Sequence, residues 1–410
     1  MNLHSQAPAA VPHAKKNIAD LAIFGGEPAF RETLHVGRPN LSGRARLMSR
    51  IETMLDSHWL TNDGPLVREF EQQIAAVAGT RHAIATCSGT TALQLAIRGL
   101  GLRDEVILPS FTFIASAHAL YWEGVTPVFA DISERDYCID PAQIEPLITP
   151  NTSAILPVHV YGQVCDVGAI AEIARRHDMP VLYDAAHAFG VTQGGKSIGG
   201  FGRASVFSFH ATKFLHSSEG GAIVTDDDRL AKSLRSMRNF GFAGEDNVTS
   251  IGINGKMPEI AAAFGLTSLE EMDHVLSVNR RNYDEYCRQL TGIPGISGIR
   301  FAAEDKSNYQ YVVIEIDAEA AGLDRDTLHR LISAEGVLVR RYFYPGCHRS
   351  EPYKSMSPGI AKRLPRTERA ITRVLSLPTG LAITPVQIAA LCGLIRFAVA
   401  HADEIRARIT

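Results

Sequence analysis

Lys213 and Asp184 place an amine and an acid at the ends of two apolar stretches of the chain. Lys213 follows residues 204–210, and Asp184 lies near the end of residues 180–185. A lysine held out of water has a lowered pKa, so its amine is nucleophilic and can condense with an aldehyde. A buried carboxylate needs a partner, and the protonated nitrogen of a pyridine ring would serve. The simpler alternatives are a solvated loop lysine and an aspartate that caps the next segment.

A turn between a predicted strand and a predicted helix offers groups that bind phosphate. Ser88 can cap a helix that begins at Gly89, where the missing side chain lets the backbone approach a ligand. The amides of Thr90 and Thr91 would be free at the positive end of that helix, where anions bind. Ser208 is placed to add a hydroxyl. A capped turn without any ligand is the alternative.

Phe113 and His187 supply the remaining groups that a flat, hydroxylated ring would contact. Phe113 follows a strand end and could stack on the ring, whereas His187 comes three residues after the acid and could touch the hydroxyl. Each could equally be an ordinary core phenylalanine or structural histidine. Taken together, a phosphate turn, a stacking aromatic, an acid and a lysine provide every group that a phosphorylated pyridoxal requires. The sequence contains no Walker loop, G-x-S-x-G elbow or H-E-x-x-H zinc helix.

Short apolar runs alternate with helical patterns from about residue 82 onward. This alternation predicts an α/β fold with a parallel sheet flanked by helices, and ligands bind at the carboxyl ends of such strands. Residues 204–210 and 221–225 are too close in sequence for a crossover helix, which predicts an antiparallel pair and therefore a mixed, mostly parallel sheet. We expect a disordered tail (1–20), a large cofactor-binding domain (21–277) and a smaller C-terminal α+β domain (278–410).

The composition argues against several kinds of binding partner and cellular setting. The 410 residues carry a formal net charge of −3, which gives no basis for a nucleic-acid partner. Six cysteines without a C-x-x-C pair argue against a structural zinc site or a disulfide framework, so we expect no metal and a reducing, cytoplasmic setting. Apolar runs stay below the ~20 residues that span a bilayer. The N-terminus lacks the apolar core of a signal peptide.

Several motifs carry a resemblance to a known family. They are SFHATK (208–213) with EGGAIVT (219–225), CSGTTALQLA (87–96), PSFTFIAS (109–116), DAAHAFG (184–190), GINGKMPEIAAAFG (252–265) and GPLVREFEQQIA (64–75). With these motifs the chain resembles the DegT/StrS group of sugar-nucleotide aminotransferases from about residue 24 to near its C-terminus. That group has the type I pyridoxal-phosphate fold of aspartate aminotransferase.

The resemblance implies a role for each residue of the site. Lys213 would bond covalently to the cofactor aldehyde and Asp184 would pair with the pyridine nitrogen. The remaining contacts would be Phe113 on the ring face and Thr90, Thr91 and Ser208 on the phosphate. Asn254 matches an asparagine that reaches the phosphate of the neighbouring subunit, which implies a homodimer with two shared active sites.

Two departures from the family pattern bear on the substrate. His187 stands where the family usually has glutamine, a substitution found in a subset that acts on 4-keto-6-deoxy sugar nucleotides. Residues 344–348 read YPGCH where many relatives read P-L-H, in a loop expected near the substrate. The sugar specificity is therefore open at this loop.

The resemblance implies transfer of an amino group from L-glutamate to a nucleotide-linked keto-deoxy sugar of the dTDP-4-keto-6-deoxyglucose type. Some relatives are dehydratases with histidine at the lysine position. Lys213 favours transamination here, because the released amine can move a proton between the donor Cα and C4′ of the cofactor. The alternatives are a 3-keto sugar nucleotide aminotransferase, a lyase or desulfurase with Cys347 as its reactive cysteine, and a non-catalytic pyridoxal-phosphate-binding regulator.

Overall fold

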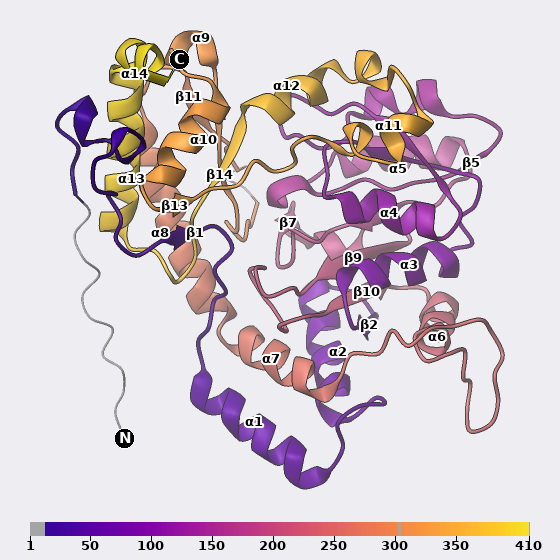
Figure 1. Cartoon of the computed structure of the whole chain (residues 1–410). Helices are drawn as coiled ribbons and strands as arrows, with labels where there is room; N and C mark the ends of the chain where they lie inside the picture. Colours follow the sequence, from indigo (N-terminus) through magenta and orange to yellow (C-terminus); the bar gives the residue numbers. More distant parts are fainter. Residues whose placement is uncertain (1–12, 302–304, 410) are drawn as a thin grey trace.

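The computed structural model describes residues 13–301 and 305–409, which form a large α/β unit and a smaller C-terminal unit (Figure 1). The large unit contains two groups of strands, in the orders β2-β10-β9-β6 and β4-β3-β5. Parallel bridges between Ile155 and Val181 and between Val158 and Asp184 join the groups at β5 and β6. The strands are β2 (His82–Thr86), β3 (Glu105–Pro109), β4 (Thr126–Ala130), β5 (Thr152–Ile155), β6 (Leu182–Asp184), β9 (Ala204–Ser208) and β10 (Gly221–Thr225).

The strand directions confirm the predicted mixed sheet. β10 runs antiparallel to both β2 and β9, whereas β6 is parallel to β9 and β3 is parallel to β4 and β5. Twelve residues separate β9 from β10, which is too short for a helical crossover. The carboxyl ends of the parallel strands therefore share one edge, and the loop that carries Lys213 lies at that edge.

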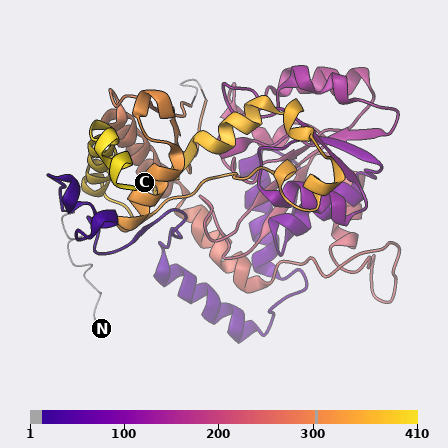
Figure 2. The same ribbon diagram turned by 45° about the horizontal axis from the view of Figure 1, so that its top comes forward.

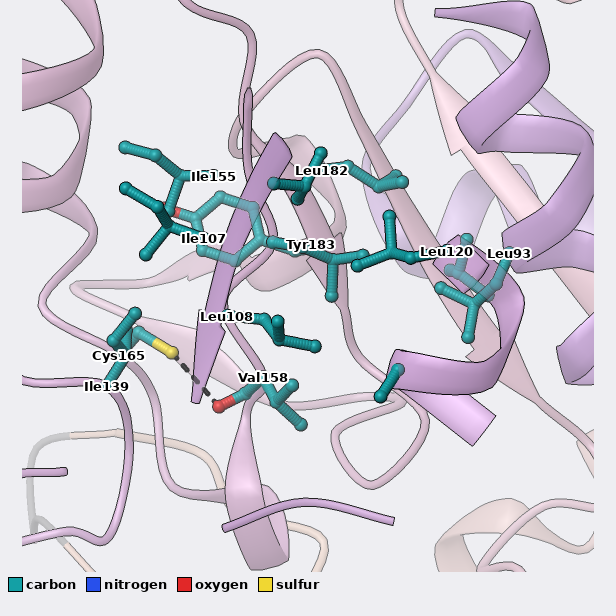
Figure 3. Close-up of a cluster of buried hydrophobic side chains, with 14 of the residues drawn as sticks. Leu93, Ile107, Leu108, Leu120, Ile139, Ile155, Val158, Cys165, Leu182 and Tyr183 are labelled. Carbon is teal, nitrogen blue, oxygen red and sulfur yellow. Dashed lines mark hydrogen bonds between the residues drawn. The ribbon is translucent and has the colours of Figure 1, made fainter. Parts of the chain in front are cut away.

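Alternate residues of the central strands pack into two different hydrophobic clusters, because side chains along a strand point to opposite faces. Ile84, Val206 and Ile223 belong to one cluster with residues of α3, α4, α5 and α6. Figure 3 shows part of this cluster, with Leu93 of α3 and Leu120 of α4. Ala85 and Phe207 belong to the other, with residues of α2 and α7. The helices are α2 (Pro65–Ala78), α3 (Gly89–Gly99), α4 (Ile114–Trp122), α5 (Val167–Arg176), α6 (Asp228–Met237) and α7 (Glu259–Glu270).

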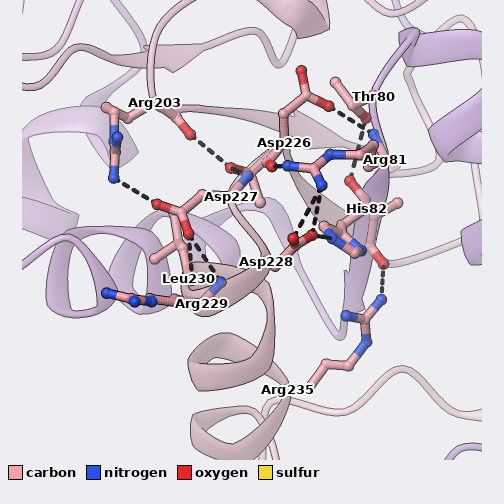
Figure 4. A network of polar contacts seen from close by, with 12 residues as sticks. Thr80, Arg81, His82, Arg203, Asp226, Asp227, Asp228, Arg229, Leu230 and Arg235 are labelled. Carbon is pink, nitrogen blue, oxygen red and sulfur yellow. Dashed lines mark hydrogen bonds and ion pairs between the residues drawn. The ribbon is translucent and has the colours of Figure 1, made fainter.

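A polar network fixes the opposite edge of the sheet (Figure 4). Asp227 caps α6 by accepting hydrogen bonds from the amides of Arg229 and Leu230, at 2.9 and 3.0 Å. His82, at the start of β2, lies 2.7 Å from Asp228 through its Nε2. These contacts hold the end of β10 next to the start of β2. They lie at the edge of the sheet opposite the carboxyl ends of the parallel strands.

The C-terminal unit is built on an antiparallel sheet in the order β11-β12-β14, as predicted for an α+β domain. The predicted boundary between residues 277 and 278 falls inside one continuous helix, α8 (Met272–Leu290), whose Val275 and Leu290 pack into different cores. The other elements are β11 (Ile296–Gly298), β12 (Val312–Ile316), β13 (Val337–Leu338), β14 (Val374–Leu377), α10 (Arg325–Ala334), α13 (Pro385–Ala400) and α14 (Ala402–Ile409).

The N-terminal segment packs against the C-terminal unit, which differs from the predicted organisation (Figure 1 and Figure 2). Of the predicted tail, residues 1–12 lie outside the described residues, whereas Ile18–Asp20 forms a 3-10 helix with Ile18 buried. β1 (Leu34–His35) pairs in parallel with β13, and Lys15 forms a buried ion pair of 2.8 Å with Glu335. Apolar side chains in this segment complete a core made mostly by residues 286–405.

Among the described residues, no single helix combines the length and apolar content needed to cross a membrane. Within the part of the chain that the structure describes, one pair of helices, α13 and α14, reaches that length and composition when taken together, with a bend of 78° between them.

Candidate active site

Lys213 lies in the loop that joins β9 to β10. The loop is held by hydrogen bonds from the Lys213 amide to the His210 carbonyl, at 2.8 Å, and from the Phe214 amide to Gln310 Oε1, at 2.9 Å. The Lys213 Nζ donates to the Tyr311 hydroxyl oxygen at 3.2 Å. Burial lowers the pKa of Lys213 to about 8, although the Asp184 carboxylate opposes this shift. The amine is therefore nucleophilic near neutral pH.

Asp184 ends β6 and is 5% exposed. Its Oδ2 accepts a hydrogen bond of 2.7 Å from Ser116 Oγ, and its Oδ1 accepts one of 3.1 Å from the Ala186 amide. Burial raises the pKa of Asp184, while these two hydrogen bonds and the charge of Lys213 lower it. Each carboxylate oxygen has further lone pairs, so the group can also accept from a ring N–H.

The turn at Ser88 is a capped helix start, as predicted. The Ser88 Oγ accepts a hydrogen bond from the Thr91 amide at 3.0 Å, and the Thr91 hydroxyl lies 2.9 Å from the same oxygen. The Thr91 amide is thus bonded within the turn and is not free for an anion, because the cap takes it first. A Cβ on Gly89 would lie 2.9 Å from Ser208 Cβ, so only glycine lets the turn approach that hydroxyl.

His187 is buried against an aromatic wall. Its ring stacks on Phe343, with centroids 5.6 Å apart, and lies 4.5 Å from the ring of Tyr311. The Tyr161 amide donates to His187 Nδ1 at 3.2 Å, which leaves the ring proton on Nε2. Burial lowers the pKa of His187 well below its ordinary value, so the imidazole is neutral.

These residues line one cavity of about 340 Å³. Phe113, at the start of α4, is 56% exposed and forms part of its wall. The structure brings together seven of the nine predicted site residues in this wall: Gly89, Thr90, Phe113, Asp184, His187, Ser208 and Lys213. Thr91 is bonded in the turn as described, and Asn254 lies exposed on the loop between α6 and α7.

The cavity also contains groups that the sequence reasoning missed. Tyr311 and Arg340 come from the C-terminal unit, and Ser116 supports Asp184 from the first turn of α4. Ser116 belongs to the motif PSFTFIAS, and this was the only sequence signal for it. Tyr342 and Phe343 line the cavity just before the loop that was expected near the substrate.

Cys347 does not have the properties of a reactive cysteine. It is 2% exposed, its Sγ donates to the Thr112 carbonyl at 3.5 Å, and burial raises its pKa to about 12. The neighbouring His348 is buried between Ser110 and Glu368, with 2.6 Å to each. These contacts hold the loop at 344–348 against Ser110, which follows β3, and against α12 (Pro365–Arg373). A desulfurase therefore loses its candidate nucleophile.

The donor set fits pyridoxal phosphate. The glycine turn and its hydroxyls suit the phosphate, Phe113 suits the ring face, Asp184 suits the ring nitrogen, and the amine of Lys213 suits the aldehyde. The fold and the site define a pyridoxal-phosphate enzyme of the type I fold. Residues 42–396 match the model of the DegT/DnrJ/EryC1/StrS aminotransferase family, and the chain belongs to this family. It is an aminotransferase that uses pyridoxal phosphate.

Individual relatives agree with this assignment. A dTDP-4-amino-4,6-dideoxy-D-glucose transaminase of Shigella dysenteriae is 38% identical over 350 residues, which cover 85% of this chain and 94% of the relative. The structure of DesI in the presence of its TDP-sugar product has a TM-score of 0.92 at 46% identity, over 96% of this chain and 100% of DesI. The structure of NtdA from Bacillus subtilis with bound cofactor PMP has a TM-score of 0.78 at 29% identity, over 88% and 82%.

Proposed function

We propose that this aminotransferase moves the amino group of L-glutamate onto the C4 carbon of a nucleotide-linked 4-keto-6-deoxy sugar. The observation that carries the proposal is the Lys213 amine, with a pKa of about 8, in one cavity with the buried Asp184. The relative of Shigella dysenteriae is named for a 4-amino-4,6-dideoxy sugar linked to dTDP, and DesI holds a TDP-sugar product. Both names support a thymidine-linked sugar, and the name of the relative of Shigella dysenteriae supports nitrogen at C4.

Asp184, Ser116 and Lys213 have different roles in the proposed reaction. When bound, pyridoxal phosphate supplies an aldehyde and a ring that accepts electrons. Asp184 would hold the proton on the ring nitrogen, and the hydrogen bond from Ser116 favours the ionised form of its carboxylate. Lys213 would move the proton that leaves the donor carbon, because an amine with a pKa of about 8 both takes and gives protons near neutral pH.

The aromatic wall and the histidine prepare the cavity for this proton transfer. Tyr311 orients the Lys213 amine, and its hydroxyl stays protonated because burial raises its pKa well above the usual value. His187 is neutral with its proton on Nε2, which makes it a hydrogen-bond donor for the ring hydroxyl. Phe343 stacks behind His187 and excludes water from that side.

We also propose that the enzyme is a cytoplasmic homodimer with shared active sites. Large apolar side chains are exposed around Asn254, on the loop between α6 and α7: Phe240, Phe242, Val248, Ile251 and Ile253. A grouping of this kind is typical of an interface. Asn254 would cross it to the phosphate of the neighbouring subunit. The cysteines of the described residues are all free, which supports a reducing compartment.

The test of the reaction has two stages. The protein loaded with pyridoxal phosphate is first mixed with L-glutamate alone, and the absorbance should change from the aldehyde form to the amine form of the cofactor. The amine form is then offered 4-keto and 3-keto sugars linked to thymidine or guanosine diphosphate, and product is detected by mass spectrometry. Turnover of a 3-keto sugar alone would contradict the C4 assignment. A loaded protein that no amino acid converts would instead be a regulator.

A further inference from the structure

A chain of buried hydroxyl groups leads to the carboxylate of Asp184. Thr112 Oγ1 lies 2.9 Å from Ser116 Oγ, and Ser116 Oγ donates to Asp184 Oδ2 at 2.7 Å. All three side chains are buried, and Thr112 and Asp184 both line the active-site cavity. Thr112 therefore reaches the acid of the site through one intervening hydroxyl, and no step of the proposed reaction has yet used it.

The chemistry of the three groups fixes the direction of these hydrogen bonds. An ionised carboxylate can only accept, so the single proton of the Ser116 hydroxyl points to Asp184. The second bond of the Ser116 oxygen is then one that it accepts, and the Thr112 hydroxyl is the donor. A hydroxyl that accepts a hydrogen bond becomes a stronger donor itself, because the bonds of such a chain polarise one another. The Thr112 hydroxyl thus strengthens the contact between Ser116 and Asp184.

The loop at 344–348 of the C-terminal unit holds the segment that carries Thr112. The Thr112 carbonyl accepts a hydrogen bond from Cys347 Sγ at 3.5 Å, and the Ser110 carbonyl accepts one from the Cys347 amide at 3.1 Å. The Ser110 hydroxyl also accepts a hydrogen bond of 3.0 Å from the His348 amide. The backbone beneath the Thr112 hydroxyl is therefore fixed by four groups that belong to two short segments.

The titratable groups beside Asp184 are Lys213, His187 and His159. The charge of Lys213 lowers the pKa of Asp184, whereas burial raises it. Both histidines are neutral, because burial lowers the pKa of each. The hydrogen bond from Ser116 acts on the carboxylate directly and also lowers its pKa. A group that strengthens this hydrogen bond therefore favours the ionised acid.

We propose that Thr112 is a positioning residue for the cofactor: its hydroxyl directs the Ser116 hydroxyl at Asp184 and so favours the ionised carboxylate that pairs with the ring nitrogen. This inference rests on the proposed pairing of Asp184 with the ring nitrogen of pyridoxal phosphate. Thr112 acts through Ser116 and does not touch the reacting atoms. A threonine that only stabilised the cavity wall would not distinguish a ring nitrogen from a ring carbon at the same place.

The first arm of the test compares two ligands of the cofactor-free protein: pyridoxal phosphate and its deaza analogue, which has carbon in place of the ring nitrogen. Both can condense with Lys213, but only pyridoxal phosphate offers a ring N–H to Asp184. Thr112→Val should weaken the binding of pyridoxal phosphate about 3- to 10-fold, the worth of one neutral hydrogen bond, and leave the binding of the analogue unchanged. Thr112→Ala, a second variant without the hydroxyl, should do the same.

Two control variants separate the hydroxyl from the packing. Thr112→Ser keeps the hydroxyl and should bind both ligands as the wild type does. Thr367→Val removes another buried threonine hydroxyl, which bonds Asp131 at 2.7 Å outside the cavity wall, and should also leave both affinities unchanged. Equal weakening of both ligands in Thr112→Val and Thr112→Ala would overturn the inference, because the threonine would then act through the shape of the wall.

The second arm needs no cofactor. NMR of protein labelled at the aspartate carboxyl carbons follows the titration of Asp184, whose signal is assigned with Asp184→Asn. The pKa of Asp184 should be higher in Thr112→Val than in the wild type, Thr112→Ser or Thr367→Val. An unchanged pKa would overturn the inference. If the pKa rises but the wild type binds the deaza analogue as tightly as pyridoxal phosphate, the pairing of Asp184 with the ring nitrogen fails and the role of Thr112 stands.

Discussion

The Lys213 amine and the Tyr311 hydroxyl lie 3.2 Å apart although the two residues are 98 positions apart in the chain. Lys213 belongs to the loop after β9 of the large unit, whereas Tyr311 directly precedes β12, the central strand of the C-terminal sheet. The reactive amine is thus oriented by a side chain from the other unit. Any change in how the two units pack would alter the position of the amine.

Tyr311→Phe should therefore lower kcat by about 10-fold, because a hydrogen bond that positions the amine is worth roughly 1–1.5 kcal/mol. KM for L-glutamate should change little. The comparison variant is Tyr353→Phe, which removes another buried hydroxyl, one that bonds His118 Nδ1 at 2.7 Å outside the cavity. Steady-state kinetics of both variants decide the matter: equal losses of kcat would mean that Tyr311 acts only through stability.

The lowered pKa of Lys213 should be visible in the stability of the cofactor-free protein. Between pH of about 8 and about 10.5 the unfolded chain holds a proton on this amine that the folded protein has released. The free energy of unfolding should therefore rise with pH across this window, and this residue should add no pH dependence below it. Urea unfolding of the wild type and Lys213→Met, measured in and below this window, isolates the effect. Parallel pH profiles for the two proteins would show that the amine is not desolvated.

Ser116→Ala should impair catalysis through Asp184. In the wild type, the hydrogen bond from Ser116 lowers the pKa of Asp184 and so opposes the effect of burial. Without this hydrogen bond the pKa of Asp184 should rise further. The acidic limb of the kcat/KM profile should then move to higher pH, with a loss of activity of about 10-fold at neutral pH. Ser116→Thr keeps the hydroxyl and should restore the profile. If the acidic limb of Ser116→Ala is not shifted, the serine does not influence the ionisation of Asp184.

Subunit complementation tests the shared active site. Lys213→Ala removes the amine of a site and Asn254→Ala removes the proposed phosphate contact to the neighbouring site. A hybrid dimer keeps one site with both residues, so equal co-expression should recover about a quarter of wild-type activity. A mixture of Lys213→Ala with Lys213→Met serves as the control and should stay inactive. Absence of recovery in the first mixture would place both residues in the same subunit's site or rule out the dimer.

The sequence was sufficient for the fold class and for most residues of the cavity wall. Alternating strand and helix patterns predicted the sheet, and the short span between β9 and β10 predicted the antiparallel strand. Lys213 and Gly89 follow strand ends and Asp184 is itself the last residue of a strand, and strand ends in such a sheet meet at one edge. Local spacing therefore determined where these groups would gather.

Groups that arrive from distant segments could not be predicted in this way. Tyr311 and Arg340 reach the cavity through the packing of the C-terminal unit, which no local pattern encodes. The Thr91 amide was expected to be free, but the same serine that marks the helix start also takes this amide. The predicted boundary falls inside α8, because this helix carries an amphipathic pattern through both units and its periodicity gives no sign of the change of core.

The position of the N-terminal segment has a practical consequence for protein engineering. Deletion of residues up to 36 would remove Ile18, Leu21 and Phe30 from the core that surrounds α13. It would also remove Lys15, the partner of the buried Glu335 carboxylate in an ion pair. Such a truncation should yield insoluble material.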